Sequence, residues 1–156
     1  MKNYYPFVLN NLSSLYEHLV KGLKGFALSS DNISRTHTFW CFLSDGTVLK
    51  VQSELNDIDG WHEVGTLEFS SVEDGDGVPN VMPLDDQWRH IQTIEKLCLD
   101  TENCYSESGI VLTNMNSQKL TIICDANPYS ISVQAPFLTM EFLPEYEILS
   151  YKRIPL

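Results

Sequence analysis

The stretch that decides the fold is THTFWCFLSDGTVLKVQSEL, at positions 36–55. Two arms rich in aromatic and β-branched residues flank an Asp45-Gly46 pair, which is typical of a β-hairpin. We expect both residues of the pair to adopt positive φ angles, as a two-residue type I′ turn requires. The first arm is apolar on both faces, so we expect it to be covered on both sides. On the second arm, Lys50 and Gln52 alternate with apolar residues and should face outward.

The pattern extends beyond this hairpin. Residues 25–30 (GFALSS) and 66–72 (TLEFSSV) also alternate and are predicted to be strands. A short helix is expected upstream, because leucines recur there at helical spacing, with asparagines before them and glycines after them. The leucines are Leu12, Leu15, Leu19 and Leu23; Asn10 or Asn11 is the expected cap, and Gly22 or Gly25 the expected end.

The same order of elements then follows a second time. In chain order these are a helix-like or turn-like segment at 87–97, a strand at 96–101, a hairpin at 108–125 that turns at Asn116-Ser117, and a strand at 129–136. The recurrence predicts an internal duplication, in which His18 falls on His90. We interpret this pair as polar helix residues rather than as metal ligands or an acid–base pair, because neither belongs to a recognised histidine motif.

These elements predict a mainly β, single-domain protein over residues 1–156, a β-rich α+β fold whose antiparallel strands form a sandwich or a strongly curved sheet. Its parts are two pseudo-repeated units, each preceded by a short helix, with an acidic linker between them and a C-terminal arm after them. Their bounds are 10–72 and 86–135 for the units, 73–86 for the linker and 136–156 for the arm.

Negative charge is concentrated in the middle third of the chain. The whole chain has 10 basic and 21 acidic residues and a net charge of −11. Residues 54–107 contain fourteen of the acids, against only Arg89 and Lys96. Such a field repels nucleic acids and anionic membranes and attracts basic partners. We therefore predict no binding to nucleic acid or membrane, and an acidic surface that docks a basic protein partner. Its predicted residues are Asp57, Asp59, Glu73, Asp74, Asp76, Asp85 and Asp86.

No catalytic or metal-binding motif is present in the sequence. The acidic loop at 72–80 (VEDGDGVPN) departs from a calcium-binding loop, because Pro79 stands where the turn glycine belongs and Asp85 where a bidentate glutamate belongs. We expect no enzymatic activity, cofactor or metal. The residues leave open one alternative, a small-molecule-binding protein or an enzyme with a pocket between the two units. Its predicted lining is Trp40, Trp61, Trp88 and His90.

The four cysteines form no CxxC pair, and Cys41 and Cys124 lie in apolar strand-like runs. The first residues lack the unbroken apolar core of a signal peptide, and no run reaches the roughly 18–20 apolar residues of a membrane span. We therefore expect a soluble protein in the reducing cytoplasm. Dimerisation through an exposed strand edge is a third possibility, so the oligomeric state stays open.

The C-terminal arm contains Pro136, Pro144 and Pro155 and is expected to be extended. Apolar residues should hold it on the body of the protein, with Lys152 and Arg153 neutralising part of the acidic middle third. The anchoring residues expected are Phe142, Ile148 and Ile154.

The second half of the chain resembles a known class of proteins. The residues that carry the resemblance are SGIVL at 108–112, KLTIICDANPYSISV at 119–133, and the ending FLPEY…YKRIPL at 142–156. Small acidic bacterial proteins of unassigned activity are similar in these segments, and some of them look like immunity partners of polymorphic toxins. The resemblance implies a non-enzymatic binder that occludes one partner, and it assigns a role to no individual residue.

Overall fold

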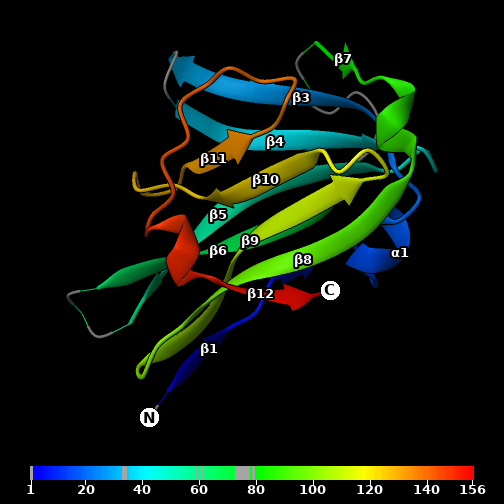
Figure 1. Cartoon of the computed structure of the whole chain (residues 1–156). Helices are drawn as coiled ribbons and strands as arrows, with labels where there is room; N and C mark the ends of the chain where they lie inside the picture. Colours follow the sequence, from blue (N-terminus) through cyan, green and yellow to red (C-terminus); the bar gives the residue numbers. More distant parts are fainter. Residues whose placement is uncertain (1, 33–34, 59, 61, 73–77, 79) are drawn as a thin grey trace.

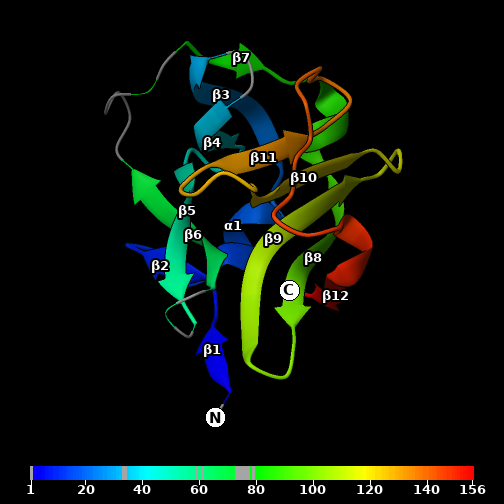
Figure 2. The ribbon, with the colours of Figure 1, turned by 90° about the vertical axis from the view of Figure 1, so that its left-hand side faces the viewer.

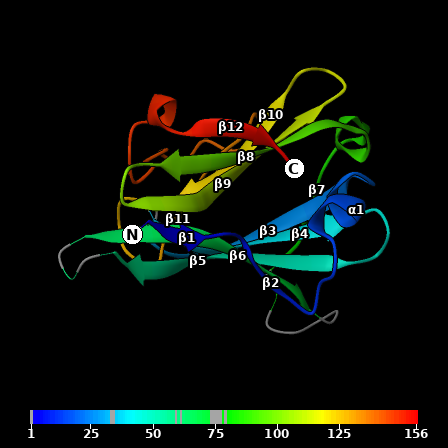
Figure 3. The ribbon, with the colours of Figure 1, turned by 90° about the horizontal axis from the view of Figure 1, so that it is seen from below.

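The computed structural model describes residues 2–32, 35–58, 60, 62–72, 78 and 80–156. The chain is mainly β and folds as one curled, open sheet, which confirms the predicted fold class (Figure 1). Figure 3 shows β8, β9, β10 and β12 in one layer and β3 to β6 in the other. The main core lies where the two layers face each other.

A short helix and a four-stranded antiparallel meander make up the first half. Its elements are α1 (Leu15–Leu19), β3 (Leu23–Asn32), β4 (Arg35–Leu43), β5 (Val48–Asp57) and β6 (Glu63–Val72). Each strand pairs with the next one along the chain. Most of these strands are a few residues longer than the predicted ones.

The second half has the same order of elements. It consists of the 3-10 helix η1 (Asp86–Arg89) followed by β8 (Ile91–Asp100), β9 (Cys104–Asn114), β10 (Lys119–Cys124) and β11 (Ile131–Gln134). These strands also form a sequential antiparallel meander, and β11 joins it to β4 through the pair Ile131–Thr36. A duplication requires two meanders with the same order of elements, and the two halves meet this requirement. That the halves descend from one ancestral unit remains a prediction.

Short strands complete the sheet. They are β1 (Asn3–Tyr5), β2 (Val8–Asn10), β7 (Met82–Pro83) and β12 (Lys152–Pro155). Figure 2 shows β1 beside β9 and β2 beside β6, and both pairs are parallel, so the N-terminal segment spans the opening between the two meanders. The arm passes through the 3-10 helix η2 (Ile148–Ser150) before β12 pairs with β8.

The turn of the first hairpin differs from the expected one. Leu43 N–H donates to Thr47 O at 2.9 Å, and only Gly46 has a positive φ, of 92°. The loop therefore has three residues with the last one left-handed, and the prediction of two positive φ angles is wrong. Asp45 Oδ1 instead accepts the amide of Thr47 at 2.9 Å, a side-chain cap that stabilises the longer loop. Ser117, with φ of 63°, takes the corresponding place in the second hairpin.

The helical expectations also need correction. The first helix has only five residues, and Ser14 rather than an asparagine is its cap. It ends at Leu19, and Gly22, one of the two glycines expected to terminate it, follows three residues later. There φ is 94°, and a Cβ would lie 2.2 Å from Arg89 O. The second segment is helical only over η1, because from Ile91 the chain is a strand. Tertiary pairing with β9 and β12 overrides the helix-like spacing there.

The first arm of the leading hairpin is covered on both faces, as predicted. Phe39 lies in the main core, whereas Trp40 and Phe42 lie in a separate cluster on the outer face. Across the main core, Leu112 and Leu120 of the second meander face the first meander. Each such side chain contributes about 1.5–3 kcal/mol when fully buried. β6 and β10 approach each other closely at Gly65, where a Cβ would lie 2.6 Å from the Cβ of Cys124.

Candidate functional site

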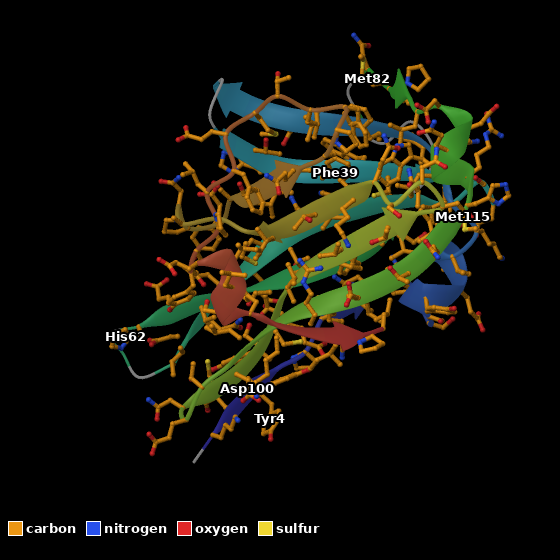
Figure 4. The ribbon with its side chains drawn as sticks, viewed as in Figure 1. Tyr4, Phe39, His62, Met82, Asp100 and Met115 are labelled. Atoms are coloured by element: carbon orange, nitrogen blue, oxygen red, sulfur yellow. The ribbon has the colours of Figure 1, made fainter. Side chains whose placement is uncertain are left out.

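An open pocket of about 420 Å³ lies at the end of the molecule where the β5–β6 and β8–β9 hairpins turn, toward the lower left of Figure 1. Three segments far apart in sequence line this pocket, which we call the tip pocket. Its described lining residues are Ile58 and His62 from the first hairpin, Leu99, Thr101, Asn103 and Cys104 from the second, and Tyr146 and Ser150 from the arm. Figure 4 labels His62 at this end.

Hydrogen bonds within each turn hold the two hairpin walls in place. In the β8–β9 turn, Thr101 N–H donates to Cys104 O at 2.8 Å, and Thr101 Oγ1 accepts the Cys104 amide at 3.1 Å. In the β5–β6 turn, Ile58 N–H donates to His62 O at 2.8 Å, and the Gly60 amide donates to Asp57 Oδ1 at 2.6 Å. Both walls are therefore preformed rather than dependent on a ligand.

The third wall is the arm, which is tied to the sheet at Glu145 and bonded to itself at Tyr146. Glu145 N–H donates to Cys124 O at 3.0 Å, and the Gly65 amide donates to Glu145 Oε1 at 3.2 Å. The Tyr146 amide donates to the hydroxyl of Tyr151 at 3.2 Å, and the two rings meet edge to face. The arm is thus held by specific bonds as well as by apolar contacts.

The floor and lip of the tip pocket are apolar. Ile58 packs against a buried cluster that contains Leu99, Cys104 and Tyr151, and the expected anchors Phe142 and Ile148 pack against the same cluster. Beside the pocket, Leu149 is 92% exposed and Tyr146 is 38% exposed. Exposed apolar side chains next to a concave site are typical of binding surfaces.

Acidic residues adjoin lining residues of all three segments in the sequence, although none of them lines the pocket itself. The described ones are Asp57, Glu63, Asp100, Glu102, Glu145 and Glu147. Asp100 is paired with Lys2 and Lys152, whereas the other five form no ion pair within the described residues. The described lining contains His62 but no lysine or arginine. Asp57 and Glu63 also stand directly opposite each other in the β5–β6 ladder, a like-charge pair that is unfavourable for folding.

Burial raises the pKa of one of these acids, Glu145. The hydrogen bond from the Gly65 amide opposes this rise, and the nearby charge of Glu63 adds to it. Burial is therefore the main cause of the rise, and the neighbouring acid is a smaller one.

Acids along β8 and the adjoining part of β9 are arranged differently. Lys2 and Lys152 both contact Asp100, and Arg153 lies 3.5 Å from Glu95. The bonds from the two lysines lower the pKa of Asp100. The basic residues of the arm thus neutralise acids of the middle third, as predicted.

The most buried of these acids, Glu107, has a partner of its own. Lys96 Nζ lies 2.5 Å from Glu107 Oε2. Burial opposes ionisation of Glu107, but the bonds from Lys96, the Phe7 amide and Tyr105 outweigh it and lower its pKa. The folded state therefore stabilises the ionised form of this carboxylate.

A second pocket, of about 330 Å³, lies near the opposite end of the molecule, beside η1. Trp88 and Phe137 pack edge to face in it, with ring centroids 5.4 Å apart. Asp85, which also lines it, uses its carboxylate to cap η1. Asp85, predicted for the acidic surface, and Trp88, predicted for the alternative pocket, thus both line this second pocket.

The three described members of the predicted acidic set do not lie together. Asp57 lies beside the tip pocket, whereas Asp85 and Asp86 lie at η1, at the other end of Figure 1. Asp86 pairs with Arg89 at 3.1 Å. Four further members of the predicted set lie outside the described residues: Asp59, Glu73, Asp74 and Asp76.

The predicted tryptophan and histidine lining is dispersed as well. Trp40 is buried on the outer face of the first meander, and Trp88 belongs to the main core. His90 is exposed at the end of η1, and Trp61 lies outside the described residues. His18 contacts the hairpin turn, with Nδ1 2.9 Å from Asp45 Oδ2. The structure therefore brings no two members of this predicted lining into one pocket among the described residues.

Sequence reasoning missed most of the tip pocket. Of the six described acids that adjoin its lining residues in the sequence, only Asp57 belongs to the predicted acidic surface; Glu63, Asp100, Glu102, Glu145 and Glu147 do not. One signal was available, because acids flank the turns of both the β5–β6 and the β8–β9 hairpins. Using it would have required knowing that the two turns lie at the same end of the sheet.

Among the residues described, no group of histidine, cysteine and acidic side chains has the arrangement of a metal site. No helix in the described ranges is long and apolar enough to cross a membrane. All four cysteines are buried and free. Comparison of the chain with protein-family models, with curated proteins and with solved structures finds no significant match.

Proposed function

We propose that this protein is a non-enzymatic cytoplasmic binding protein that docks a basic protein partner at its hairpin-tip end. The observation that supports this is the contrast in charge pairing. Acids along β8, including Asp100 beside the pocket, have cationic partners within the chain, whereas the other acids next to lining residues in the sequence have none among the described residues. Uncompensated carboxylates beside exposed apolar side chains suit a cationic partner surface.

The two features of the site would act at different stages of binding. Unpaired carboxylates on three separate walls would steer a basic surface toward this end and accelerate encounter. The exposed Leu149 and Tyr146 would then be buried and supply affinity, since aromatic and apolar anchors dominate binding energy at interfaces. Neutralisation of a basic toxin, as an immunity protein would perform it, is the most specific form of this proposal.

The test is equilibrium binding to the partner, isolated by affinity capture from the native cell. Glu102→Lys with Glu147→Lys reverses two exposed acids beside the tip pocket. The matched control, Glu17→Lys with Asp86→Lys, makes the same change in net charge at the α1 and η1 end. We expect the tip variant to weaken binding by about a hundredfold and the control to leave it within about twofold. Equal effects of the two variants would refute the proposal.

A second candidate function is supported by the pocket's size. Small-molecule sites usually have volumes of about 300–1,000 Å³, and the tip pocket lies within this range. Under this alternative the protein is a small-molecule-binding protein or an enzyme. Native mass spectrometry of freshly purified protein distinguishes the two functions. A stoichiometric small ligand, lost in a variant whose pocket is filled, would favour the alternative.

A further inference from the structure

We infer that residues 2–10 occupy a strand-pairing site between the two meanders, and that an extended, basic segment of the partner exchanges with them. This inference rests on the proposed docking function and assigns the form of the partner segment that is bound. The site, which we call the edge site, consists of β9 at 104–106 and β6 at 68–70. Figure 2 shows β1 and β2 along these two edges.

The two strands of the edge site each have an edge that the body of the sheet leaves uncovered. β8 pairs along one edge of β9 over 105–114, whereas β10 covers the other edge only over 109–113. The rest of that second edge pairs with β1. On β6, β5 occupies one edge along the whole strand, and β2 occupies part of the other. Uncovered strand edges are templates for an added strand, and extended peptides bind to proteins in this way.

The N-terminal segment that covers these edges is built to leave as a unit. Its two strands have three residues each, and Pro6 between them has no N–H for the ladder. Within the described residues, β1 pairs only with β9 and β2 only with β6, and no hairpin turn joins them to those partners. Asn11 follows with a positive φ of 57°, so the chain changes direction before α1. A terminal segment held in this way opens at a small cost compared with the core strands.

The contacts of this segment show the chemistry that the edge site accepts. Three of its donors bond to carboxylates of the body: Lys2 Nζ to Asp100, the Phe7 amide to Glu107 Oε1 at 2.8 Å, and Asn10 Nδ2 to Glu68 Oε1 at 2.8 Å. Residues 2–10 contain one lysine and no acid. When the segment leaves, Lys152 and Lys96 remain on two of these carboxylates, so the body stays intact while acceptor positions open. An extended segment that carries positive charge and hydrogen-bond donors matches this site.

One apolar position also has to be filled. The ring of Phe7 meets Phe69 edge to face, with centroids 5.0 Å apart, and packs against the main core. The ring of Tyr4 contacts Tyr105 but is 67% exposed. A replacing segment therefore needs a large apolar side chain at the place of Phe7, whereas the place of Tyr4 is less demanding.

The edge site begins at the end of the molecule where the proposed docking takes place. The Asn3 amide donates to Asn103 O at 3.0 Å in the β8–β9 turn, and Tyr5 Oη donates to Asp57 O at 3.3 Å at the end of β5. A partner that is guided to the exposed acids of the hairpin tips therefore meets the start of the edge site. Exchange of one strand for another can then proceed from the free N-terminus.

The test uses the full-length protein and a fluorescent peptide with the sequence of residues 2–10 (KNYYPFVLN), blocked at both ends. In the natural protein the attached segment competes at an effective concentration on the order of 1 mM, so the peptide should bind weakly. Phe7→Ala in the protein removes the ring that anchors the attached segment. We expect fluorescence anisotropy to show that the peptide binds this variant at least about tenfold more tightly than the natural protein. A peptide carrying Lys2→Glu should bind the variant several-fold more weakly than the unchanged peptide.

Phe137→Ala is the matched control. Phe137 is also a partly buried phenylalanine that packs against the main core, but it lies beside Trp88 at the η1 end. We expect no gain in peptide binding in this variant. Hydrogen exchange measured by mass spectrometry separates release of the segment from a general loss of stability. In Phe7→Ala, residues 68–70 and 104–106 should lose protection while β10 keeps it, and the peptide should restore the protection.

Several results would overturn the inference. Equal peptide binding by the natural protein, Phe7→Ala and Phe137→Ala would show that the peptide does not enter the edge site. Equal binding of the Lys2→Glu peptide would remove the requirement for a basic segment. A Phe7→Ala protein that dimerises in light scattering and excludes the peptide would show that a second copy, rather than a partner, fills the site.

The two proposals can fail separately. If reversal of Glu102 and Glu147 weakens the natural partner while the peptide and the partner bind Phe7→Ala together without competing, the docking function stands and the strand exchange is wrong. If that reversal leaves the natural partner unaffected, the docking function itself is wrong, whatever the peptide does.

Discussion

Acids on the β8 side of the sheet and acids around the tip pocket differ in their surroundings rather than in their chemistry. Asp100 and Glu107 contact lysines from other parts of the chain, and their pKa values are lowered. Glu145 has no cation beside it among the described residues, and burial raises its pKa. The first group therefore contributes to the stability of the fold. In the second group, Glu102 and Glu147 are exposed to solvent and form no described ion pair.

The largest effect on stability is expected at the buried pair. Glu107→Leu leaves the ammonium of Lys96 and the amide of Phe7 without their acceptor in a largely buried site. We expect the free energy of unfolding in urea to fall by about 3 kcal/mol, as for other broken buried pairs. Adding Lys96→Met should restore a large part of this loss, because no uncompensated charge then remains. A loss below about 1 kcal/mol in the single variant would show that the pair is not structural.

A smaller effect on stability is expected at Glu145, and its dependence on pH should be opposite to that of Glu107. Because its folded pKa is raised above the ordinary 4.5, the folded state binds more protons just above that value, and stability falls as pH rises through this window. Glu145→Gln should remove this fall while keeping an acceptor for the Gly65 amide. We therefore expect the variant to be as stable as the natural protein or more stable at about pH 7.

Glu107 provides the control for that measurement. Its folded pKa is lowered, so its contribution is present above the ordinary pKa and is lost as pH falls through the folded value. Unfolding measured across the acid and neutral range should give slopes of opposite sign for the two residues. Slopes of the same sign would contradict the distinction between paired and unpaired acids.

The smallest effect on stability is expected from the charge reversals. Glu102, Glu147 and Glu17 are exposed, and their carboxylates make no described ion pair. The tip variant and its control at Glu17 and Asp86 should both unfold within about 0.5 kcal/mol of the natural protein. Differential scanning calorimetry checks this. A large loss in the tip variant would mean that the unpaired acids are structural after all.

Much of the fold could be predicted from the sequence, because alternating apolar residues and turn residues mark both meanders. The turn type at Asp45 could not, since it depends on a side-chain cap to Thr47. The strand beginning at Ile91 was hidden by helix-like spacing, and β1 and β2 were missed because each has only three residues, paired in parallel with distant strands. Local patterns carry little information about such long-range pairing.

The site was harder to predict for a related reason. The charge count over residues 54–107 treats all acids alike, but Lys2 and Lys152, far away in sequence, neutralise Asp100 in the folded protein. Conversely, Glu145 lies outside that range, and the arm brings it to the Gly65 amide with no described cation beside it. Which acids remain unpaired is a property of tertiary structure, so composition predicts the sign of the surface but not its location.

The most direct test of the docking proposal is the association rate with the isolated partner as salt is varied. Raising ionic strength from about 0.1 M to about 1 M shortens electrostatic screening from about 10 Å to about 3 Å. We predict that the natural protein and the Glu17/Asp86 control associate about tenfold faster at the lower salt. The Glu102/Glu147 variant should associate slowly and almost independently of salt. Identical salt dependence in all three proteins would contradict the claim that the tip acids guide the partner.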